Sequence, residues 1–319
     1  MDSLAIIIPV YKKSFLVETL ESIASQTNKN FNLYICNDNS PYDIDEIVDD
    51  FKNKHNLSLE YIKFKENLGG KDLVAHWERC VEQTKDESLI WLFSDDDVLE
   101  PDCVESLFET VNRVPYVDVF RFNLSIINGK SNIIKHCRNY PDMLSSEDFF
   151  ALLYSGKIDA RMPEFVFRRK RYDESGGYVS FDLAWRSDNA TVIRMSALNG
   201  IMTIPKSRVL WRISEDNISA KNNLDVRRRK DLSTISFFNW IDSYFKLIGA
   251  SYKLSTFRLE LAYSVSLLET KETYSLVKLF KLSNSYIYNI NNYRKFLFVL
   301  ATYYNCLRNF KNKILKSNR

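Results

Sequence analysis

Three consecutive carboxylates, Asp95, Asp96 and Asp97, directly follow a run of apolar residues in the segment LIWLFSDDDV, residues 89–98. The apolar run is typical of a buried strand. Carboxylates crowded at its end repel one another unless a cation lies between them. Their hard oxygen atoms suit Mg²⁺ or Mn²⁺, and Mg²⁺ is usually held by one or two carboxylates together with substrate phosphates. Alternatively, the acids only mark a helix N-terminus, because Pro101 and an apolar helical pattern follow.

The apolar run before these acids is one of four predicted strands in the first third of the chain. The first is a β-branched run ended by Pro9, which indicates a strand buried on both faces, the kind found in parallel sheets. Amphipathic helical patterns separate the strands. This alternation predicts a wound α/β sheet that is mostly parallel. The four predicted strands span residues 4–8, 31–36, 57–64 and 89–93.

Polar or turn-forming residues end three of the four strands. They are Pro9-Val10-Tyr11 after the first, Asn37-Asp38-Asn39-Ser40 after the second and Ser94-Asp95-Asp96-Asp97 after the fourth. In wound α/β sheets, ligands bind outside the carboxyl ends of the strands. We therefore expect the three segments to lie side by side along one rim and to form a binding site.

The remainder of the chain divides into two parts. Residues 113–222 are mixed and complete a first domain, 1–222, whose other half is 1–112. After Asn222 glycine almost vanishes and proline disappears, so 223–319 is predicted to be a helical C-terminal region. Strands are predicted in the mixed part at residues 117–124, 164–167 and 209–213.

Composition narrows the classes of protein. The chain has 319 residues, 45% of them hydrophobic and 27% charged, so a packed core is expected. The net charge of +3 argues against a nucleic-acid partner. Five cysteines without a CxxC pair favour a reduced, cytoplasmic setting. No signal-peptide pattern opens the sequence, and the longest apolar run near its end, 296–301, is too short to span a bilayer.

Four stretches within residues 4–112 carry a family resemblance: LAIIIPVYKKSFLVETLESIASQT, LYICNDNS, ENLGGKD and WLFSDDDVLEPD. In this order and spacing they resemble the family 2 glycosyltransferases, which have the GT-A fold, a Rossmann-like and mostly parallel wound sheet. The resemblance implies that 1–112 is a nucleotide-binding half and 113–222 an acceptor-binding half. It also implies a divalent cation, Mn²⁺ or Mg²⁺.

The resemblance assigns nucleotide-sugar contacts to residues on the predicted rim. Pro9, Val10 and Tyr11 match the turn that lies against the base and ribose. Asp38 matches the acid that hydrogen-bonds the base, and Asn37 stands where the family often has a second acid.

A glycine-bearing loop is also expected near the nucleotide. Asn67, Gly69 and Lys71 fall at its positions in the family. Glycine permits close backbone approach, and lysine offers a charge for phosphate. Alternatively, the glycines form an ordinary strand-to-helix turn and Lys71 is a solvated side chain.

The acidic trio matches the family's metal motif, in a shifted form. The family often has an acid two residues before Asp95, where this chain has Phe93. The resemblance implies Asp95 on the ribose or the metal, Asp97 on the metal, and Asp96 on either the nucleotide sugar or the metal.

The second half resembles the family's acceptor side through Phe165-Val166-Phe167-Arg168-Arg169, Gly176-Gly177-Tyr178 and Arg186-Ser187-Asp188. Asp188 matches the general base that removes the acceptor's proton. Asp182 is a second candidate. Alternatively, Asp188 only caps a helix over residues 189–197.

A later segment, Trp211-Arg212 to Ser214 with Asn217-Ile218-Ser219, resembles the part that the family places over the diphosphate. Many members have a metal-binding histidine there, and this chain has none. Arg212 or the Ser214 hydroxyl is the candidate to assist the leaving diphosphate. His76, beside Trp77, is expected to belong to helix packing.

The C-terminal tail is basic and amphipathic. Such a helix can lie on an anionic membrane surface, peripheral to the inner face of the plasma membrane. Alternatively, it packs on the catalytic domain with a solvated basic face. Residues 291–319 contain seven basic and no acidic residues: Arg294, Lys295, Arg308, Lys311, Lys313, Lys316 and Arg319.

These features predict an inverting glycosyltransferase that moves a sugar from a nucleoside-diphosphate sugar, a UDP-sugar being favoured, to a hydroxyl of a glycan or lipid-linked acceptor. Family analogy suggests cell-surface polysaccharide synthesis, such as capsule, O-antigen or lipooligosaccharide. One alternative is a non-catalytic scaffold that binds nucleotide sugars. Another is a nucleotidyltransferase, which we disfavour because Pro9-Val10-Tyr11-Lys12-Lys13 replaces the expected glycine-rich loop.

Overall fold

The computed structural model describes residues 2–214, 223–267 and 292–317. In these residues a ten-stranded sheet runs through the first part of the chain, in the order β3-β2-β1-β4-β9-β6-β10-β5, with β7 paired to β6 and β8 to β10. The strands are β1 (Leu4–Val10), β2 (Phe31–Asn37), β3 (Leu59–Lys63), β4 (Leu89–Leu92), β5 (Val98–Leu99), β6 (Val119–Ile127), β7 (Ile133–His136), β8 (Met143–Leu144), β9 (Phe165–Arg168) and β10 (Ile201–Arg212).

The first four long strands form the predicted parallel block. β1 pairs in parallel with β2 on one side and with β4 on the other, and β3 continues the block beyond β2. The side chains of β1 alternate between the two faces of the sheet. Ala5 and Ile7 enter one core cluster, whereas Leu4, Ile6 and Ile8 enter the other. The prediction of a strand buried on both faces is therefore confirmed.

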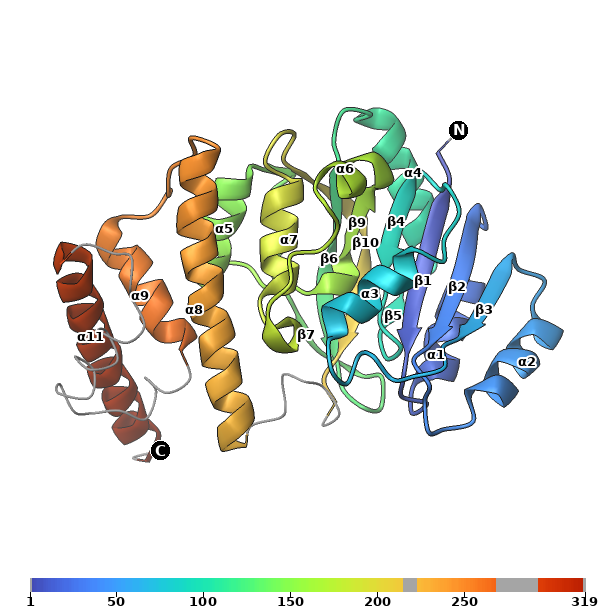
Figure 1. Cartoon of the computed structure of the whole chain (residues 1–319), viewed down its shortest axis with the longest axis horizontal. Coiled ribbons are helices and arrows are strands. Elements are labelled where there is room, and N and C mark those ends of the chain that lie inside the picture. Colours follow the sequence, from blue (N-terminus) through green and yellow to red (C-terminus); the bar gives the residue numbers. More distant parts are fainter. Residues whose placement is uncertain (1, 215–222, 268–291, 318–319) are drawn as a thin grey trace.

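Helices cover both faces of this sheet (Figure 1). Side chains of α1, α2 and α4 belong to one core cluster, and those of α3, α5, α7 and the later helix α8 (Leu224–Leu247) to the other. The helices of the first part are α1 (Leu16–Ala24), α2 (Ile44–Lys54), α3 (Leu73–Val81), α4 (Cys103–Arg113), α5 (Ser146–Tyr154), α6 (Arg169–Glu174) and α7 (Ser187–Met195), with short 3₁₀ turns η1 (Met162–Glu164) and η2 (Asp182–Ala184).

The second half departs from simple alternation. β9 lies antiparallel between β4 and β6 and so joins the parallel block to the rest of the sheet. β10 is much longer than the predicted strand at 209–213. It runs parallel to β6, and its register shifts between Ile204 and Arg208. The shift brackets Pro205, which has no N–H for the ladder, so the strand continues through an irregularity rather than beginning after it.

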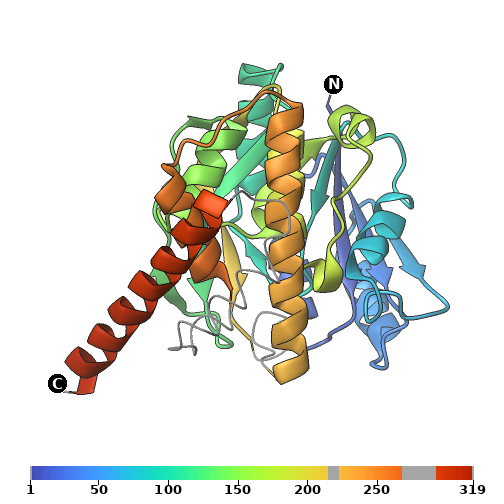
Figure 2. The same cartoon turned by 60° about the vertical axis from the view of Figure 1, so that its left-hand side comes forward.

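The described C-terminal part is helical, as predicted. It contains α8 (Leu224–Leu247), α9 (Thr256–Ser266) and α11 (Asn292–Ser317). α8 contacts α7 and η2, and α9 contacts both α8 and α11. Figure 2 shows α8 running along the outside of the molecule and α11 extending away from it. No helix among the described residues is both long and apolar enough to cross a membrane.

Candidate active site

A cavity of about 760 Å³ opens at the carboxyl ends of β1, β2 and β4. Both halves of the first domain line it, so the predicted rim and the predicted acceptor side face one space. The predicted residues among its lining are Pro9, Val10, Tyr11, Asp38, Asn67, Gly69, Asp95, Asp96 and Asp188. Lys71, Asp97 and Arg212 are not among the residues that line it.

The Asp95 carboxylate ties the end of β4 to the turn after β1. Its Oδ2 accepts hydrogen bonds from the backbone N–H groups of Tyr11, at 3.0 Å, and Lys12, at 2.9 Å. Burial raises the pKa of Asp95, while the Lys12 ammonium and these two N–H groups act in the opposite direction. The carboxylate therefore fixes the turn that the resemblance places against the nucleotide.

Lys12 brings a cation to the acidic cluster that the sequence reasoning did not anticipate. Its Nζ lies 2.6 Å from Asp96 Oδ2 and 3.5 Å from Asp95 Oδ1. Burial alone would lower the pKa of Lys12, but attraction to Asp95 and Asp96 outweighs it and the pKa is raised. The only signal in the sequence was a lysine immediately after the Pro9-Val10-Tyr11 turn, on the predicted rim.

Asp97 and Arg212 lie behind the cavity wall. Asp97 Oδ1 accepts the backbone N–H of Arg212 at 2.7 Å, and burial followed by repulsion from Asp96 raises the pKa of Asp97 well above its usual range. The fully buried Arg212 guanidinium donates to the Asp96 carbonyl at 2.7 Å and pairs with Glu18 at 2.7 Å. These contacts give both residues a structural role in holding the acidic loop, and they give no support to direct contact with a metal or nucleotide.

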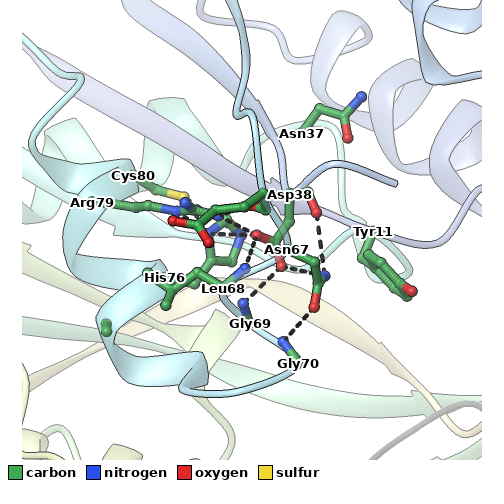
Figure 3. A network of polar contacts seen from close by, with 12 residues as sticks. Tyr11, Asn37, Asp38, Asn67, Leu68, Gly69, Gly70, His76, Arg79 and Cys80 are labelled. Atoms are coloured by element: carbon green, nitrogen blue, oxygen red, sulfur yellow. Dashed lines mark hydrogen bonds and ion pairs between the residues drawn. The ribbon is translucent and has the colours of Figure 1, made fainter. Parts of the chain in front are cut away.

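Asp38 is held by a ring of donors (Figure 3). Its Oδ2 accepts from Asn67 Nδ2 at 2.9 Å and from the Gly69 N–H at 2.8 Å, and its Oδ1 accepts from the Leu68 N–H at 2.9 Å and from Arg79. Four donors fill about all the lone pairs that a carboxylate offers. An N–H group of a base that donates to this carboxylate would therefore have to replace one of them.

The hydrogen bonds to Asp38 explain why the loop has a glycine at position 69. A Cβ at Gly69 would lie 2.7 Å from Asp38 Oδ2, so only glycine lets the backbone reach the carboxylate. Lys71, by contrast, is 75% exposed and lies 3.8 Å from Glu66, which matches the alternative of a solvated lysine. Sequence reasoning missed Arg79, although α3 places it one turn after His76.

His76 is a buried residue of α3 that also lines the cavity. It is buried, and burial together with the nearby Arg79 lowers its pKa to about 4, against the attraction of Asp38. The imidazole is therefore neutral near pH 7, with its Nδ1 accepting a hydrogen bond from Arg79 Nε at 3.0 Å.

Asp188 occupies the first turn of α7 and lines the same cavity as Asp95 and Asp96. Its Oδ1 accepts the Asn189 N–H at 2.7 Å. Burial raises the pKa of Asp188, and Asn189, Arg186 and Arg161 oppose this increase. Asp182, the second candidate, is exposed and paired with Arg229 at 2.6 and 2.8 Å, and it does not line the cavity.

The Gly176-Gly177-Tyr178 turn is anchored to α3. Both glycines have positive φ, 73° and 72°. Glu78 accepts the Tyr178 N–H at 2.5 Å and the Tyr172 hydroxyl. This contact joins the turn to α3, so it links residues of the predicted halves 1–112 and 113–222.

The family model described as "Glycosyl transferase family 2" matches residues 5–177, more than half of the chain. The chain belongs to glycosyl transferase family 2. No curated protein matches it. Membership in this family makes the chain a glycosyltransferase and sets aside the nucleotidyltransferase alternative.

Solved glycosyltransferases share the GT-A fold of this family 2 chain. Residues 1–349 of TarS from S. aureus, in complex with UDP-GlcNAc, are 15% identical with a TM-score of 0.57, and the match covers 94% of this chain and 79% of that one. The mannosyltransferase PcManGT from Pyrobaculum calidifontis, in complex with GDP-Man and Mn²⁺, is 14% identical with a TM-score of 0.53 over 96% and 87% of the two chains. GalNAc-T7, with UDP, GalNAc and Mn²⁺, is 12% identical with a TM-score of 0.54 over 83% and 57%.

The cavity of this family 2 chain offers few candidate metal ligands among the described residues. Among residues 2–214, 223–267 and 292–317, no group of three or more His, Cys, Asp or Glu side chains is arranged to hold a metal ion. Of the acidic trio, Asp95 and Asp96 do line the cavity. Because one or two carboxylates together with substrate phosphates suffice for Mg²⁺, these residues fit a cation that arrives with a diphosphate. The segment Asn217-Ile218-Ser219 lies outside the described residues.

Proposed function

We propose that this glycosyltransferase moves a sugar from a nucleoside-diphosphate sugar to an acceptor hydroxyl, with inversion at the anomeric carbon. One observation carries the proposal: Asp95 and Asp96, from the nucleotide half, and Asp188, from the acceptor half, line a single cavity. A cavity of about 760 Å³ is of the size that encloses a small-molecule ligand. The site thus has carboxylates for the diphosphate end and a separate base for the acceptor end.

The donor end would work through residues of the parallel block. The turn at Pro9, Val10 and Tyr11 and the loop at Asn67 and Gly69 would enclose the nucleoside, with Asp38 holding the loop in shape. Asp95 and Asp96 would hold Mg²⁺ or Mn²⁺, which when bound supplies positive charge against the leaving diphosphate. Lys12, already beside both carboxylates, can turn its ammonium toward a phosphate oxygen.

The acceptor end would work through Asp188. Its carboxylate would take the proton of the acceptor hydroxyl as that oxygen bonds to the anomeric carbon and the sugar–phosphate bond breaks. A raised pKa strengthens Asp188 as a base, provided that it stays ionised at the working pH. Because the attack is a direct displacement, the product should have the opposite anomeric configuration to the donor.

A thermal-shift screen tests the donor assignment. Ligands that bind only the native state raise the melting temperature by mass action. UDP-, GDP-, dTDP- and CMP-sugars would be compared with and without Mn²⁺, and a UDP-sugar with Mn²⁺ is expected to stabilise most. Product analysis should then find a nucleoside diphosphate. Absence of stabilisation by every nucleotide would contradict the proposal.

We further propose a glycan or lipid-linked acceptor, within cell-surface polysaccharide synthesis, met at an anionic membrane surface. Six large apolar side chains of α11 are between 42% and 64% exposed: Tyr293, Phe296, Leu300, Tyr303, Tyr304 and Leu307. Arg308 beside them is also exposed, whereas Arg294 is paired with Asp242 and Glu260 and is not free to meet lipid. The side chains of the basic residues after Arg308 lie outside the described set.

Vesicle sedimentation separates the two alternatives for the tail. Binding to vesicles containing phosphatidylglycerol, lost in high salt and weakened by Tyr303→Ser and Arg308→Gln together, would support attachment. Equal recovery in the supernatant with anionic and neutral vesicles would instead support a tail that only packs on the protein.

A further inference from the structure

Two arginines, Arg161 and Arg186, line the cavity near Asp188 without an ion-pair partner in the described part of the chain. The remaining cation of the lining, Lys12, is neutralised by Asp95 and Asp96. The lining on this side of the cavity therefore carries two guanidinium charges and one carboxylate. Two further acids that act on Arg161 lie outside the lining, and both have other partners: Asp159 is paired with Lys135 and Glu164 with Arg121. A positive charge held inside a cavity is costly unless an anion meets it, and a ligand can supply that anion.

Aromatic rings hold both guanidiniums in place. The Arg161 Cζ lies 4.6 Å from the centre of the Trp211 ring, and the Arg186 Cζ lies 5.3 Å from the centre of Trp185 and 5.7 Å from that of Tyr154. A guanidinium over a ring is attracted by the π-electrons and keeps its N–H groups for a partner at its edge. Aromatic contact thus positions both charges, and the Arg186 guanidinium also acts on the Tyr154 hydroxyl, where it opposes the rise in pKa that burial causes.

Hydrogen-bond donors remain on these side chains. Arg161 donates from Nη1 to the Ala160 carbonyl at 2.6 Å. The Arg186 Nε is buried and has no hydrogen-bond partner among the described residues. A buried donor left unpaired costs free energy, so a ligand that accepts from it recovers that cost.

The backbone at each arginine has a distinct feature: a hydrogen bond fixes it at Arg161, and it is strained at Arg186. Arg161 precedes η1, and its N–H donates to Glu164 Oε2 at 3.3 Å, while Glu164 is paired with the equally buried Arg121. Arg186 has a left-handed conformation with φ of 77° directly before α7. A residue other than glycine in that conformation is strained, and such strain is concentrated at functional sites.

We propose that Arg161 and Arg186 bind an anionic group, a phosphate or carboxylate, on the acceptor, and so hold the acceptor hydroxyl toward Asp188. Guanidinium groups suit both anions because they can donate two parallel hydrogen bonds. This inference rests on the proposed function. The donor's diphosphate is the other source of the same chemistry, and it is expected at the acidic loop, where Lys12, Asp95 and Asp96 lie.

Binding of inorganic phosphate tests the subsite without knowledge of the acceptor. Calorimetry would measure phosphate binding to the full chain, both free and saturated with the nucleoside diphosphate that stabilises it, and separately the affinity for that nucleotide. Arg186→Gln and Arg161→Gln are compared with Arg113→Gln, an exposed arginine of α4 outside the cavity. Arg186→Lys retains the charge, and melting temperatures verify folding.

The expected result is that phosphate binds the nucleotide-loaded wild type and that each cavity variant weakens this binding at least about tenfold. Arg113→Gln should match the wild type, Arg186→Lys should recover part of the loss, and nucleotide affinity should stay unchanged. Loss of nucleotide affinity in the cavity variants would assign the arginines to the donor and overturn the inference. Failure of the loaded wild type to bind phosphate would overturn it as well.

Failure of the proposed function would look different. In that case the wild type binds none of the nucleotides, whereas phosphate still binds the free protein through Arg161 and Arg186. An anion site without a nucleotide site would contradict sugar transfer and leave the anion subsite standing.

Discussion

The Lys12 ammonium lies 2.6 Å from Asp96 Oδ2, inside the cavity formed by the carboxyl ends of the strands. With Asp95 Oδ1 only 3.5 Å away, it contacts both carboxylates that we propose as ligands of a divalent cation. A bound divalent cation would therefore compete with the ammonium for these carboxylates. A diphosphate would relieve this competition by offering the ammonium another anion.

Lys12→Met should strengthen binding of Mn²⁺ to the nucleotide-free protein. Removing the ammonium leaves two carboxylates uncompensated, and at such short range a unit charge is worth a few kcal/mol, so an increase of at least about tenfold in affinity is expected. Electron paramagnetic resonance of free Mn²⁺ measures it directly. Lys13→Met, which removes an exposed lysine next to it, is the matched control. Unchanged or weaker Mn²⁺ binding in Lys12→Met would show that the ammonium does not compete with Mn²⁺ at Asp95 and Asp96.

Asp188→Asn should abolish most of the sugar transfer and leave donor binding intact. A general base contributes about 10²- to 10⁴-fold to rate, so kcat should fall within that range. The Asn side chain keeps the acceptor for the Asn189 N–H, which protects the start of α7. Asp182→Asn, outside the cavity, should retain wild-type kcat. If wild type and Asp188→Asn turn over donor at the same background rate, the non-catalytic scaffold is the correct interpretation.

The pH profile of kcat/KM should show an acid limb set by Asp188. The base works only when ionised, so the rate is full above its pKa and falls as the pH falls through it. Burial places this limb above the usual range of an aspartate. Arg186 lowers the pKa of Asp188, so Arg186→Gln should move the limb to higher pH, while Arg113→Gln leaves it in place. If the acid limb of Arg186→Gln lies at the same pH as that of the wild type, the Arg186 charge does not act on Asp188.

Gly177→Ala should destabilise the protein more than Gly176→Ala. Both positions have positive φ, which costs about 1–2 kcal/mol for alanine. A Cβ at Gly177 would also lie 2.3 Å from Glu78 Oε1, whereas nothing lies within 4 Å of one at Gly176. Displacing Glu78 from the Tyr178 N–H should add roughly 1–3 kcal/mol to the loss in unfolding free energy. Equal losses in urea denaturation would mean that Glu78 moves aside freely.

The parallel block could be predicted from sequence because each of its strands is a local apolar run between turn signals. Strands of the second half were predicted at residues 117–124 and 164–167, which match β6 and β9, but their pairing was not. The antiparallel position of β9 depends on partners in β4 and β6 that are distant in sequence, and Pro205 concealed the first half of β10.

For the candidate site, the sequence predicted which residues lie at the strand ends, but not the directions of their side chains. Strand ends identified Asp38, Asp95 and Asp96, because carboxyl ends of parallel strands must meet. Roles that depend on side-chain direction were not accessible: Asp97 turns back to the Arg212 N–H, and Arg79 reaches Asp38 from a helix. Nothing local in the sequence separates such buried partners from residues that face a ligand.

The most direct test of the donor site is a crystal structure of the protein soaked with Mn²⁺ and the nucleoside diphosphate that stabilises it, with anomalous scattering to locate the metal. We expect manganese bound by Asp95 or Asp96 together with the phosphates, the nucleoside against Tyr11 and Gly69, and the Lys12 ammonium moved to a phosphate oxygen. A nucleotide bound elsewhere, with Lys12 still on Asp96 and no manganese beside the acidic loop, would contradict the donor site and with it the proposed reaction.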